Sequence, residues 1–311
     1  MWVQGLCERC GGDRYAESAE SLAVSHGLRV PAGADWGYKD GMKAWVFLLT
    51  MTWSAGAPCA KVTEEEARKA FGEVHGAFVL RDCASGEETV FGAETADTAF
   101  GPCSSFKIWN SLIGLEEGII TEPDALFWSW DGEERNFPTW NADQTWRSAF
   151  AASCVPAFQD LARKIGEERM QEWLEKLDYG NRDQCGRPDA FWLPRAGQKT
   201  VLITPREQAR MVCRMIDGKL PVKAESVAKL TEVMKLVNTE RGTLYGKTGS
   251  GLRGEADGPK SEVDTDMGWL VGFVESGGKK YAYACLVLGG GLAGKDARRV
   301  AEAVLGSAGL L

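Results

Sequence analysis

Runs of apolar residues bounded by turn signals occur at both ends of the chain. Residues 76–82 and 88–91 form two such runs on either side of an Ala-Ser-Gly segment, which predicts a β-hairpin. Three further strand-like runs lie toward the C-terminus, at residues 243–247, 267–275 and 280–288. A sheet built from these segments would take its strands from both ends of the chain.

The middle of the chain has a different period. Apolar residues recur there every three or four positions, as they do along one face of an amphipathic helix. Helices are predicted over residues 103–117, 147–165, 167–177, 205–217 and 226–236, with a charged helix at 63–72 and a closing helix at 295–305. Strands that flank a helical middle predict a single α+β domain over residues 58–311.

Composition narrows the class of protein. The 311 residues carry a formal charge of −8 and show no basic stripe or cluster, so the sequence gives no support for nucleic-acid binding. Aromatic residues make up 10% of the chain and include twelve tryptophans, which favours a packed core over a disordered chain.

The segment that begins at Met42 has the features of a secretory signal peptide. Lys43 is followed by a run of about ten apolar residues and then by small residues that end at Ala57. The run is shorter than the roughly 20 residues of a membrane span, so no stable membrane anchor is expected. We therefore expect residues 42–57 to direct the protein to the periplasm and to be removed.

Residues 1–41 precede this signal. Because a signal peptide normally begins a protein, we expect them to be an upstream extension that the mature protein lacks. The alternative is a genuine cytoplasmic extension in which Cys7 and Cys10 form a metal or redox pair. Cys59 also leaves open a lipoprotein, although the residues before it fit that signal poorly.

Ser104 and Lys107 form a Ser-x-x-Lys motif, in which helical spacing lets the hydroxyl and the amine touch. A catalytic serine needs a base, and with only two histidines in the chain a lysine is the expected partner. The motif recurs at residues 226–229 and 276–279, but only the first copy lies in an apolar run. Burial there would lower the pKa of Lys107, which makes it a base and a neutral amine able to react with carbon dioxide.

Two more segments complete a possible site. Ser153-Cys154-Val155 lies within the predicted helix 147–165, and Lys247-Thr248-Gly249 ends a predicted strand. Taken singly, the first is consistent with a buried serine bonded to the preceding turn and the second with an edge-strand lysine. In the second, the amine and hydroxyl could hold a carboxylate, and the glycine allows close approach to the backbone.

The order of these motifs resembles the class D (oxacillinase-type) serine β-lactamases. The resemblance includes Tyr179-Gly180-Asn181 and extends over residues 75–307. It implies the fold of serine β-lactamases and penicillin-binding proteins, an antiparallel sheet flanked by helices with a helical lobe. It also implies a β-lactam as the small-molecule substrate, no metal, and no cofactor other than carbon dioxide or bicarbonate for lysine carboxylation.

The resemblance assigns a role to each residue. Ser104 would attack the strained amide, Lys107 would be carboxylated and act as the general base, and Ser153 would relay a proton. Trp192 would donate its indole N–H to the carbamate, and the backbone N–H groups of Ser104 and Ser250 would form the oxyanion hole. Phe106, Val155 and Leu193 would keep the pocket apolar. The substrate carboxylate would be bound by Lys247, Thr248, Gly249 and an arginine of the last helix, either Arg298, which we take as the candidate, or Arg299.

Cys103 and Cys154 each adjoin a motif, so we hypothesise a disulfide between them that braces the site. The alternative is a pair of buried free thiols. A monomer and a homodimer are both consistent with the sequence.

Three alternative functions remain at this stage. A β-lactam sensor domain would acylate without turnover, and a penicillin-binding peptidase would act on cell-wall peptides. A binding protein with inactive chemistry is disfavoured by the intact motifs.

Overall fold

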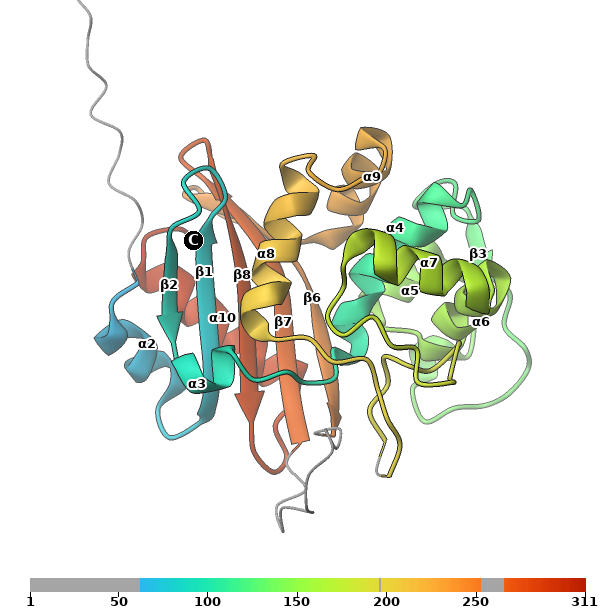
Figure 1. Cartoon of the computed structure of the whole chain (residues 1–311), viewed down its shortest axis with the longest axis horizontal. Coiled ribbons are helices and arrows are strands. Elements are labelled where there is room, and N and C mark those ends of the chain that lie inside the picture. The colour runs from blue at the N-terminus through green and yellow to red at the C-terminus, as the bar shows by residue number, and fades with distance from the viewer. Residues whose placement is uncertain (1–61, 196, 253–265) are drawn as a thin grey trace, which may run out of the picture. The chain divides into compact units, whose positions relative to one another are not determined.

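The computed structural model describes residues 62–195, 197–252 and 266–311, and the segments expected at 1–41 and 42–57 lie outside them. Strands from both ends of the chain form one sheet in the order β2-β1-β8-β7-β6-β5, with every neighbouring pair antiparallel (Figure 1). The predicted hairpin and the three C-terminal strands are confirmed. The strands are β1 (His75–Asp82), β2 (Glu88–Phe91), β5 (Lys235–Asn238), β6 (Gly242–Leu252), β7 (Asp266–Ser276) and β8 (Lys279–Leu288).

Helices cover both faces of this sheet. Along β1, Ala77 and Val79 belong to one buried cluster, while Phe78 and Leu80 belong to another, as the alternation of strand side chains requires. The first cluster fills the space between the sheet, α8 (Pro205–Ile216) and the helical lobe. The second lies between the opposite face of the sheet and the helices α10 (Gly294–Ser307) and α2 (Glu64–Phe71) (Figure 1). Capping boxes at Thr63 and Thr204 begin α2 and α8.

The helical lobe lies beside β6 and carries most of the helices predicted in the middle of the chain. A short 3₁₀ helix, η1, leads into it from the sheet. The lobe consists of η1 (Cys103–Phe106), α4 (Lys107–Glu116), α5 (Trp146–Ala151), α6 (Val155–Ile165), α7 (Glu167–Leu177) and α9 (Ala224–Met234), with a two-stranded sheet of β3 (Leu126–Trp128) and β4 (Gln144–Thr145) and a 3₁₀ turn η2 (Pro138–Trp140). A further short helix, α3 (Ala93–Ala96), follows β2.

Two predicted helices are wrong in extent. The helix expected over residues 147–165 is interrupted between α5 and α6, where Ser153 adopts a φ of 53° that no α-helix contains. The helix expected over residues 226–236 ends at Met234, and the next four residues form the edge strand β5. Both boundaries are set by contacts with β6, which local periodicity does not report.

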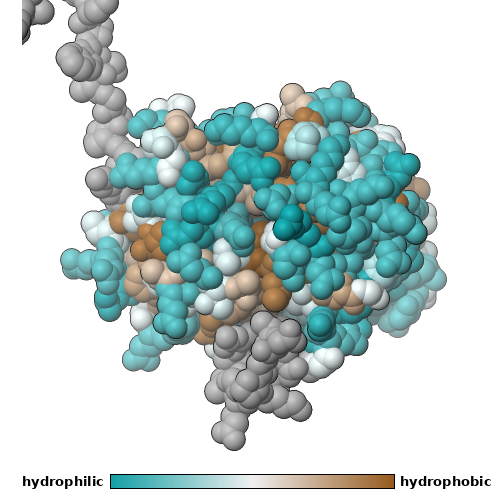
Figure 2. Space-filling model, in the orientation of Figure 1, coloured by the Kyte–Doolittle hydropathy of each residue, from teal (hydrophilic) through white to brown (hydrophobic). Residues whose placement is uncertain are grey.

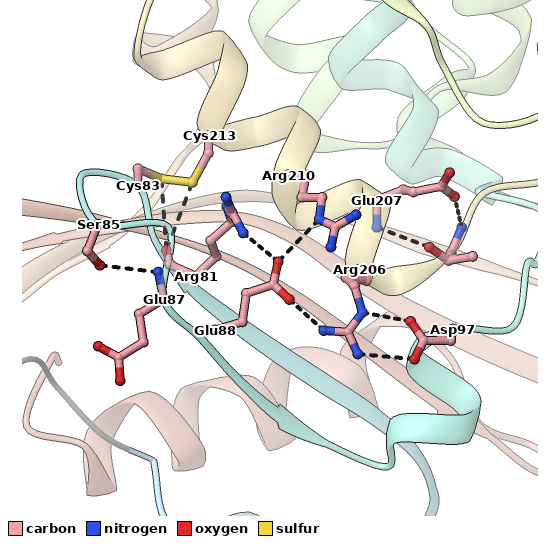
Figure 3. A network of polar contacts seen from close by, with 11 residues as sticks. Arg81, Cys83, Ser85, Glu87, Glu88, Asp97, Arg206, Glu207, Arg210 and Cys213 are labelled. Atoms are coloured by element: carbon pink, nitrogen blue, oxygen red, sulfur yellow. Dashed lines mark hydrogen bonds and ion pairs between the residues drawn. A yellow bond between two sulfur atoms is a disulfide. The ribbon is translucent and has the colours of Figure 1, made fainter.

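A disulfide and a set of ion pairs fasten α8 to the β1–β2 hairpin and to α3 (Figure 3). Cys213 of α8 is bonded to Cys83, at the end of β1. The carboxylate of Glu88 contacts Arg81 at 2.6 Å, Arg206 at 2.5 Å and Arg210 at 3.3 Å, and Arg206 also binds Asp97. We refer to this group, Arg81, Glu88, Asp97, Arg206 and Arg210, as the Glu88 network.

The surface seen in Figure 2 is largely hydrophilic over the helical lobe, with apolar residues gathered toward the centre of the view. Leu126 and Phe137 are large apolar side chains that remain more than half exposed. Among the described residues, no helix combines the length and the apolar character that crossing a membrane requires.

Candidate active site

Ser104 and Lys107 occupy the junction of η1 and α4. Lys107 Nζ lies 2.9 Å from Ser104 Oγ, as the Ser-x-x-Lys spacing predicts. Lys107 is completely buried, whereas Ser104 keeps a small exposed fraction of 8%. The neighbouring Ser105 turns away and donates its hydroxyl to the carbonyl of Pro102 at 2.7 Å. Ser104 is therefore the serine that Lys107 can activate.

The electrostatics of Lys107 favour the neutral amine. Burial lowers its pKa well below the ordinary value of 10.5, and the nearby Lys247 lowers it further. The thiols of Cys154 and Cys103 act in the opposite direction, and no carboxylate of the described residues is among the groups that shift this pKa. The lowered pKa expected from the apolar sequence setting is thus confirmed.

Aromatic rings enclose this region. The ring of Phe106 contacts Tyr179, Phe191 and Trp192, with centroid distances of 5.1, 5.0 and 5.7 Å. The ring of Phe158 lies 5.2 Å from Lys107 Nζ. Trp192 is completely buried, and its indole N–H has no hydrogen-bond partner among the described residues. Because an unpaired buried donor costs about 1–3 kcal/mol, this N–H favours a group with an acceptor oxygen.

Ser153 and Lys247 meet across the site from different elements. Lys247 Nζ, from β6, donates to Ser153 Oγ in the connection between α5 and α6. Lys247 also contacts Thr248 O at 3.0 Å and Thr248 Oγ1 at 3.3 Å. Burial lowers the pKa of Lys247 to about 7, so its charge changes near neutral pH.

Two site-adjacent residues other than glycine adopt the left-handed backbone region, Cys103 with φ 52° and Ser153 with φ 53°. Such conformations cost of order 1–3 kcal/mol and persist where the surroundings enforce them. Here they set the direction of the chain immediately before Ser104 and immediately before Cys154 and Val155.

Gly249 allows β6 to press against η1. A Cβ at this position would lie 3.0 Å from both Pro102 O and Ser105 N. Within the described residues, β5 pairs with β6 only as far as Tyr245. Because it has no Cβ, the glycine lets the turn that carries Ser104 pack closely on β6, and the approach of a ligand to its backbone stays a prediction.

Ser250, Val155 and Leu193 are other residues predicted to line the site. Ser250 lies next along β6, and its hydroxyl accepts a hydrogen bond from Gly294 N at 2.9 Å. Val155 is the first residue of α6, and Leu193 packs against the core cluster that contains Phe106. Their roles toward a substrate stay predictions.

Arg298 has its own partner. Its Nε donates to Glu302 one turn further along α10, at 2.7 Å. The described hydrogen bonds of Lys247 go instead to Ser153 and Thr248. Its role in binding a substrate carboxylate stays a prediction.

The Cys103–Cys154 disulfide is not formed in the structure: both cysteines are buried free thiols. Cys103 Sγ points to Gly101 O at 3.7 Å and fills the space beside Gly251 of β6, so it is turned toward the sheet. Cys154 instead lies at the N-terminus of α6. Burial raises the pKa of Cys103 to about 12, which keeps it a neutral thiol. The disulfide that the structure does form joins Cys83 and Cys213.

The Tyr179-Gly180-Asn181 triplet supports the site from outside. Asn181 exchanges hydrogen bonds with Leu202 through its backbone N–H and its side-chain oxygen. Gly180 has φ 50°, and a Cβ there would lie 2.1 Å from Leu202 O. The Tyr179 ring packs on Phe106, so the triplet shapes the aromatic enclosure.

Sequence reasoning did not find Gln208. This glutamine is completely buried in α8 and donates through Nε2 to Ser105 Oγ at 3.1 Å. The one signal in the sequence is a polar residue on the apolar face of a predicted helix.

Comparisons with known proteins agree with this geometry. The family model "Penicillin binding protein transpeptidase domain" matches residues 69–306. A probable β-lactamase, YbxI of Bacillus subtilis, is 32% identical over 269 residues, covering 82% of this chain and 95% of that protein. The β-lactamase OXA-5 of Pseudomonas aeruginosa is 36% identical over 68% of this chain and 75% of its own length.

Solved structures extend the similarity. A class D β-lactamase from Bacillus subtilis superimposes with a TM-score of 0.71 at 31% identity, covering 81% of this chain and 98% of that chain. The C-terminal domain of the Bacillus licheniformis BlaR penicillin-receptor gives a TM-score of 0.70 at 27% identity, over 80% of this chain and 95% of that domain.

The fold and the serine–lysine site define a protein of the penicillin-binding transpeptidase family. Within that family, the chain belongs to the class D β-lactamases.

Proposed function

We propose that the protein hydrolyses the β-lactam ring of penicillin-type antibiotics through an acyl-enzyme on Ser104. The observation that carries the proposal is Lys107, a fully buried amine 2.9 Å from Ser104 Oγ with a pKa held far below its ordinary value. A neutral amine in this position can accept the serine proton as Ser104 attacks the ring carbonyl.

The surroundings of Lys107 fit a carboxylated lysine. The amine is buried among apolar groups, and the indole N–H of Trp192 has no partner among the described residues. Carboxylation would supply an oxygen base that accepts the Ser104 proton and later activates the hydrolytic water. Trp192 would donate to it and hold its orientation, and Phe106 and Leu193 would exclude bulk water.

Ser153 and Lys247 are suited to protonate the nitrogen of the β-lactam ring. When Ser104 attacks, the C–N bond of the ring breaks and the nitrogen must gain a proton. Ser153 would deliver that proton, and Lys247, with a pKa of about 7, would replace it. Protonated Lys247 and the Thr248 hydroxyl would also attract the substrate carboxylate, with Arg298 as a further candidate.

The oxyanion would lie between the backbone N–H groups of Ser104 and Ser250. Contact of η1 with β6 at Gly249 and Gly251 brings these two segments together, which supports the assignment. Val155 would border the same pocket from the first turn of α6.

Export to an oxidising compartment is part of the proposal. The Cys83–Cys213 disulfide is of the kind that persists outside the cytoplasm. We propose that residues 42–57 direct the chain to the periplasm and that residues 1–41 are absent from the mature protein.

Steady-state hydrolysis of a chromogenic cephalosporin tests the function. Sustained turnover by the purified protein, abolished in Ser104→Ala, is the expected result. Covalent adduct on Ser104→Ala would remove the nucleophile assignment. Bicarbonate should restore activity that is lost at acidic pH, and indifference to bicarbonate would remove the carboxylated lysine.

The second candidate is a sensor that acylates without turnover. The regulatory protein BlaR1 of Bacillus licheniformis is 30% identical over 76% of this chain, and the BlaR penicillin-receptor domain shares the fold. A single stoichiometric burst of product in the same assay would favour this candidate.

A further inference from the structure

Gln208 joins two parts of the site that are far apart in the sequence. It lies on α8, completely buried, and its Nε2 donates to Ser105 Oγ at 3.1 Å. Ser105 Oγ in turn donates to Pro102 O at 2.7 Å. The amide of Gln208 therefore ends a chain of hydrogen bonds that closes the turn from Pro102 to Ser105, and Ser104 lies inside that turn.

The same side chain also lies near Tyr179. Gln208 Oε1 and the Tyr179 hydroxyl are both buried and have no hydrogen-bond partner among the described residues. Burial raises the pKa of Tyr179 well above its ordinary value, and the Gln208 side chain acts in the opposite direction. Tyr179 packs on Phe106, the residue before Lys107. One amide thus contacts the turn before Lys107 and lies near the ring that supports it.

The turn needs such support because it is strained and compressed. Cys103 adopts φ 52°, which an ordinary side chain disfavours. Gly249 brings β6 to within close contact of Pro102 O and Ser105 N on one side. Gln208 supplies a side-chain hydrogen bond to this turn from a distant element, and Trp269 of β7 donates to Gly101 just before it at 3.0 Å.

We propose that Gln208 is a positioning residue, which fixes Ser105 and thereby holds Ser104 Oγ in contact with Lys107. The proposal rests on the proposed function for its kinetic consequence. Gln208 does not touch the reacting atoms, so its loss should lower the rate of acylation and leave noncovalent substrate binding unchanged. A displacement on the order of 1 Å at a reacting group can cost about 10²-fold in rate.

Gln208→Met tests this, because methionine keeps the unbranched length and removes both amide groups. The acylation rate constant for a penicillin should fall by about 10- to 100-fold, with the noncovalent dissociation constant unchanged. Gln184→Met is the matched control: Gln184 is also buried and bonds to Glu167 O at 2.9 Å, away from η1. A Gln208→Met enzyme that acylates like the control overturns the proposal.

A double-mutant cycle separates positioning from general loss of stability. In a Ser105→Ala background, Gln208→Met should have little further effect on acylation, because its partner is already gone. If Gln208→Met lowers the acylation rate by the same factor with and without Ser105→Ala, Gln208 does not act through Ser105 and the proposal is overturned.

A measurement without substrate distinguishes failure of this proposal from failure of the proposed function. Amide hydrogen exchange of residues 103–107 should be faster in Gln208→Met and unchanged in Gln184→Met. If the wild-type protein does not acylate, the proposed function fails, but this exchange experiment still decides whether Gln208 holds the turn. Unchanged exchange in Gln208→Met overturns the proposal.

Discussion

The Glu88 network and the active site both bring charged groups out of water, and they differ in how those groups are paired. In the Glu88 network, one carboxylate contacts three guanidinium groups. Burial acts to raise the pKa of Glu88, but hydrogen bonds from Arg206 and Arg81 outweigh it and the pKa is lowered. The carboxylate stays ionised.

In the active site, two buried amines have no carboxylate partner among the described contacts. Burial lowers the pKa of Lys107 and of Lys247, and Lys247 lowers that of Lys107 further. Pairing keeps Glu88 charged and contributes to stability, whereas the absence of pairing makes the amines available for proton transfer. The same fold thus contains a region of paired charges that stabilises the structure and a region of unpaired amines that suits proton transfer.

The largest expected effect comes from removing the unpaired amine. Lys107→Ala should lower kcat for a penicillin by about 10²- to 10⁴-fold, because the general base is lost. Any acyl-enzyme that forms should accumulate, which intact-protein mass spectrometry detects. Lys229→Ala is the matched control, since Lys229 is paired with Glu122 and Glu225 at the surface. Full turnover by Lys107→Ala would contradict the assignment.

Opening the disulfide beside the Glu88 network should affect stability alone. Replacement of both Cys83 and Cys213 by alanine should lower the free energy of unfolding by about 2–4 kcal/mol, chiefly by relaxing the constraint on the unfolded chain. Urea denaturation measures this loss, while kcat/KM in the folded enzyme should stay close to wild type. Cys185→Ala, which removes a free thiol, should change little. An unfolding free energy equal to wild type in the double variant would refute the expectation.

Glu88→Gln should lower the free energy of unfolding by a smaller amount, about 1–3 kcal/mol, because three arginines lose the negative charge that they share. Since the folded pKa of Glu88 is lowered below 4.5, its contribution is complete above about pH 4.5 and disappears as the pH falls through the folded value. The stability gap between wild type and variant should therefore close in acid. Glu172→Gln, on the exposed face of α7, should show no such gap. A gap that does not depend on pH would argue against the electrostatic origin.

The smallest expected effect is a pH dependence of substrate binding. Lys247 has a pKa of about 7 and is charged only below it, so the attraction for a substrate carboxylate weakens as the pH rises. The KM for a penicillin should rise several-fold between pH 6 and pH 8. Lys247→Arg keeps its charge over this range and should flatten the profile. A KM that is flat in the wild type would show that Lys247 does not bind the carboxylate.

The sequence was sufficient wherever the information is local. The Ser104–Lys107 contact follows from helical spacing, and the lowered pKa of Lys107 follows from the apolar residues around it. Strands β1, β2, β6, β7 and β8 follow from apolar runs between turn residues, whereas the edge strand β5 was expected to be helical. Class membership came from motifs whose order along the chain is itself informative.

The sequence was insufficient where distant segments decide the outcome. The break at Ser153 has no turn signal of its own, because Ser153 is held by Lys247, 94 positions away. Neither the Cys83–Cys213 pairing nor the contact between Gln208 and Ser105 has a local pattern. The Cys103–Cys154 hypothesis assumed that neighbouring motifs bring their cysteines together, and the backbone at Cys103 directs its thiol to β6 instead.

The Cys83–Cys213 bond, with its sequence separation of 130, makes the chain between these residues a covalent loop. Ser104, Lys107, Ser153 and Trp192 all lie within that loop, while Lys247 lies outside it. A protease that cuts the loop once leaves a single covalent molecule in which the nucleophile, its base and Trp192 remain linked. A cut between residues 213 and 247 instead leaves Lys247 on a separate polypeptide. The nicked protein then keeps Lys247 in place only through noncovalent contacts such as those of the sheet.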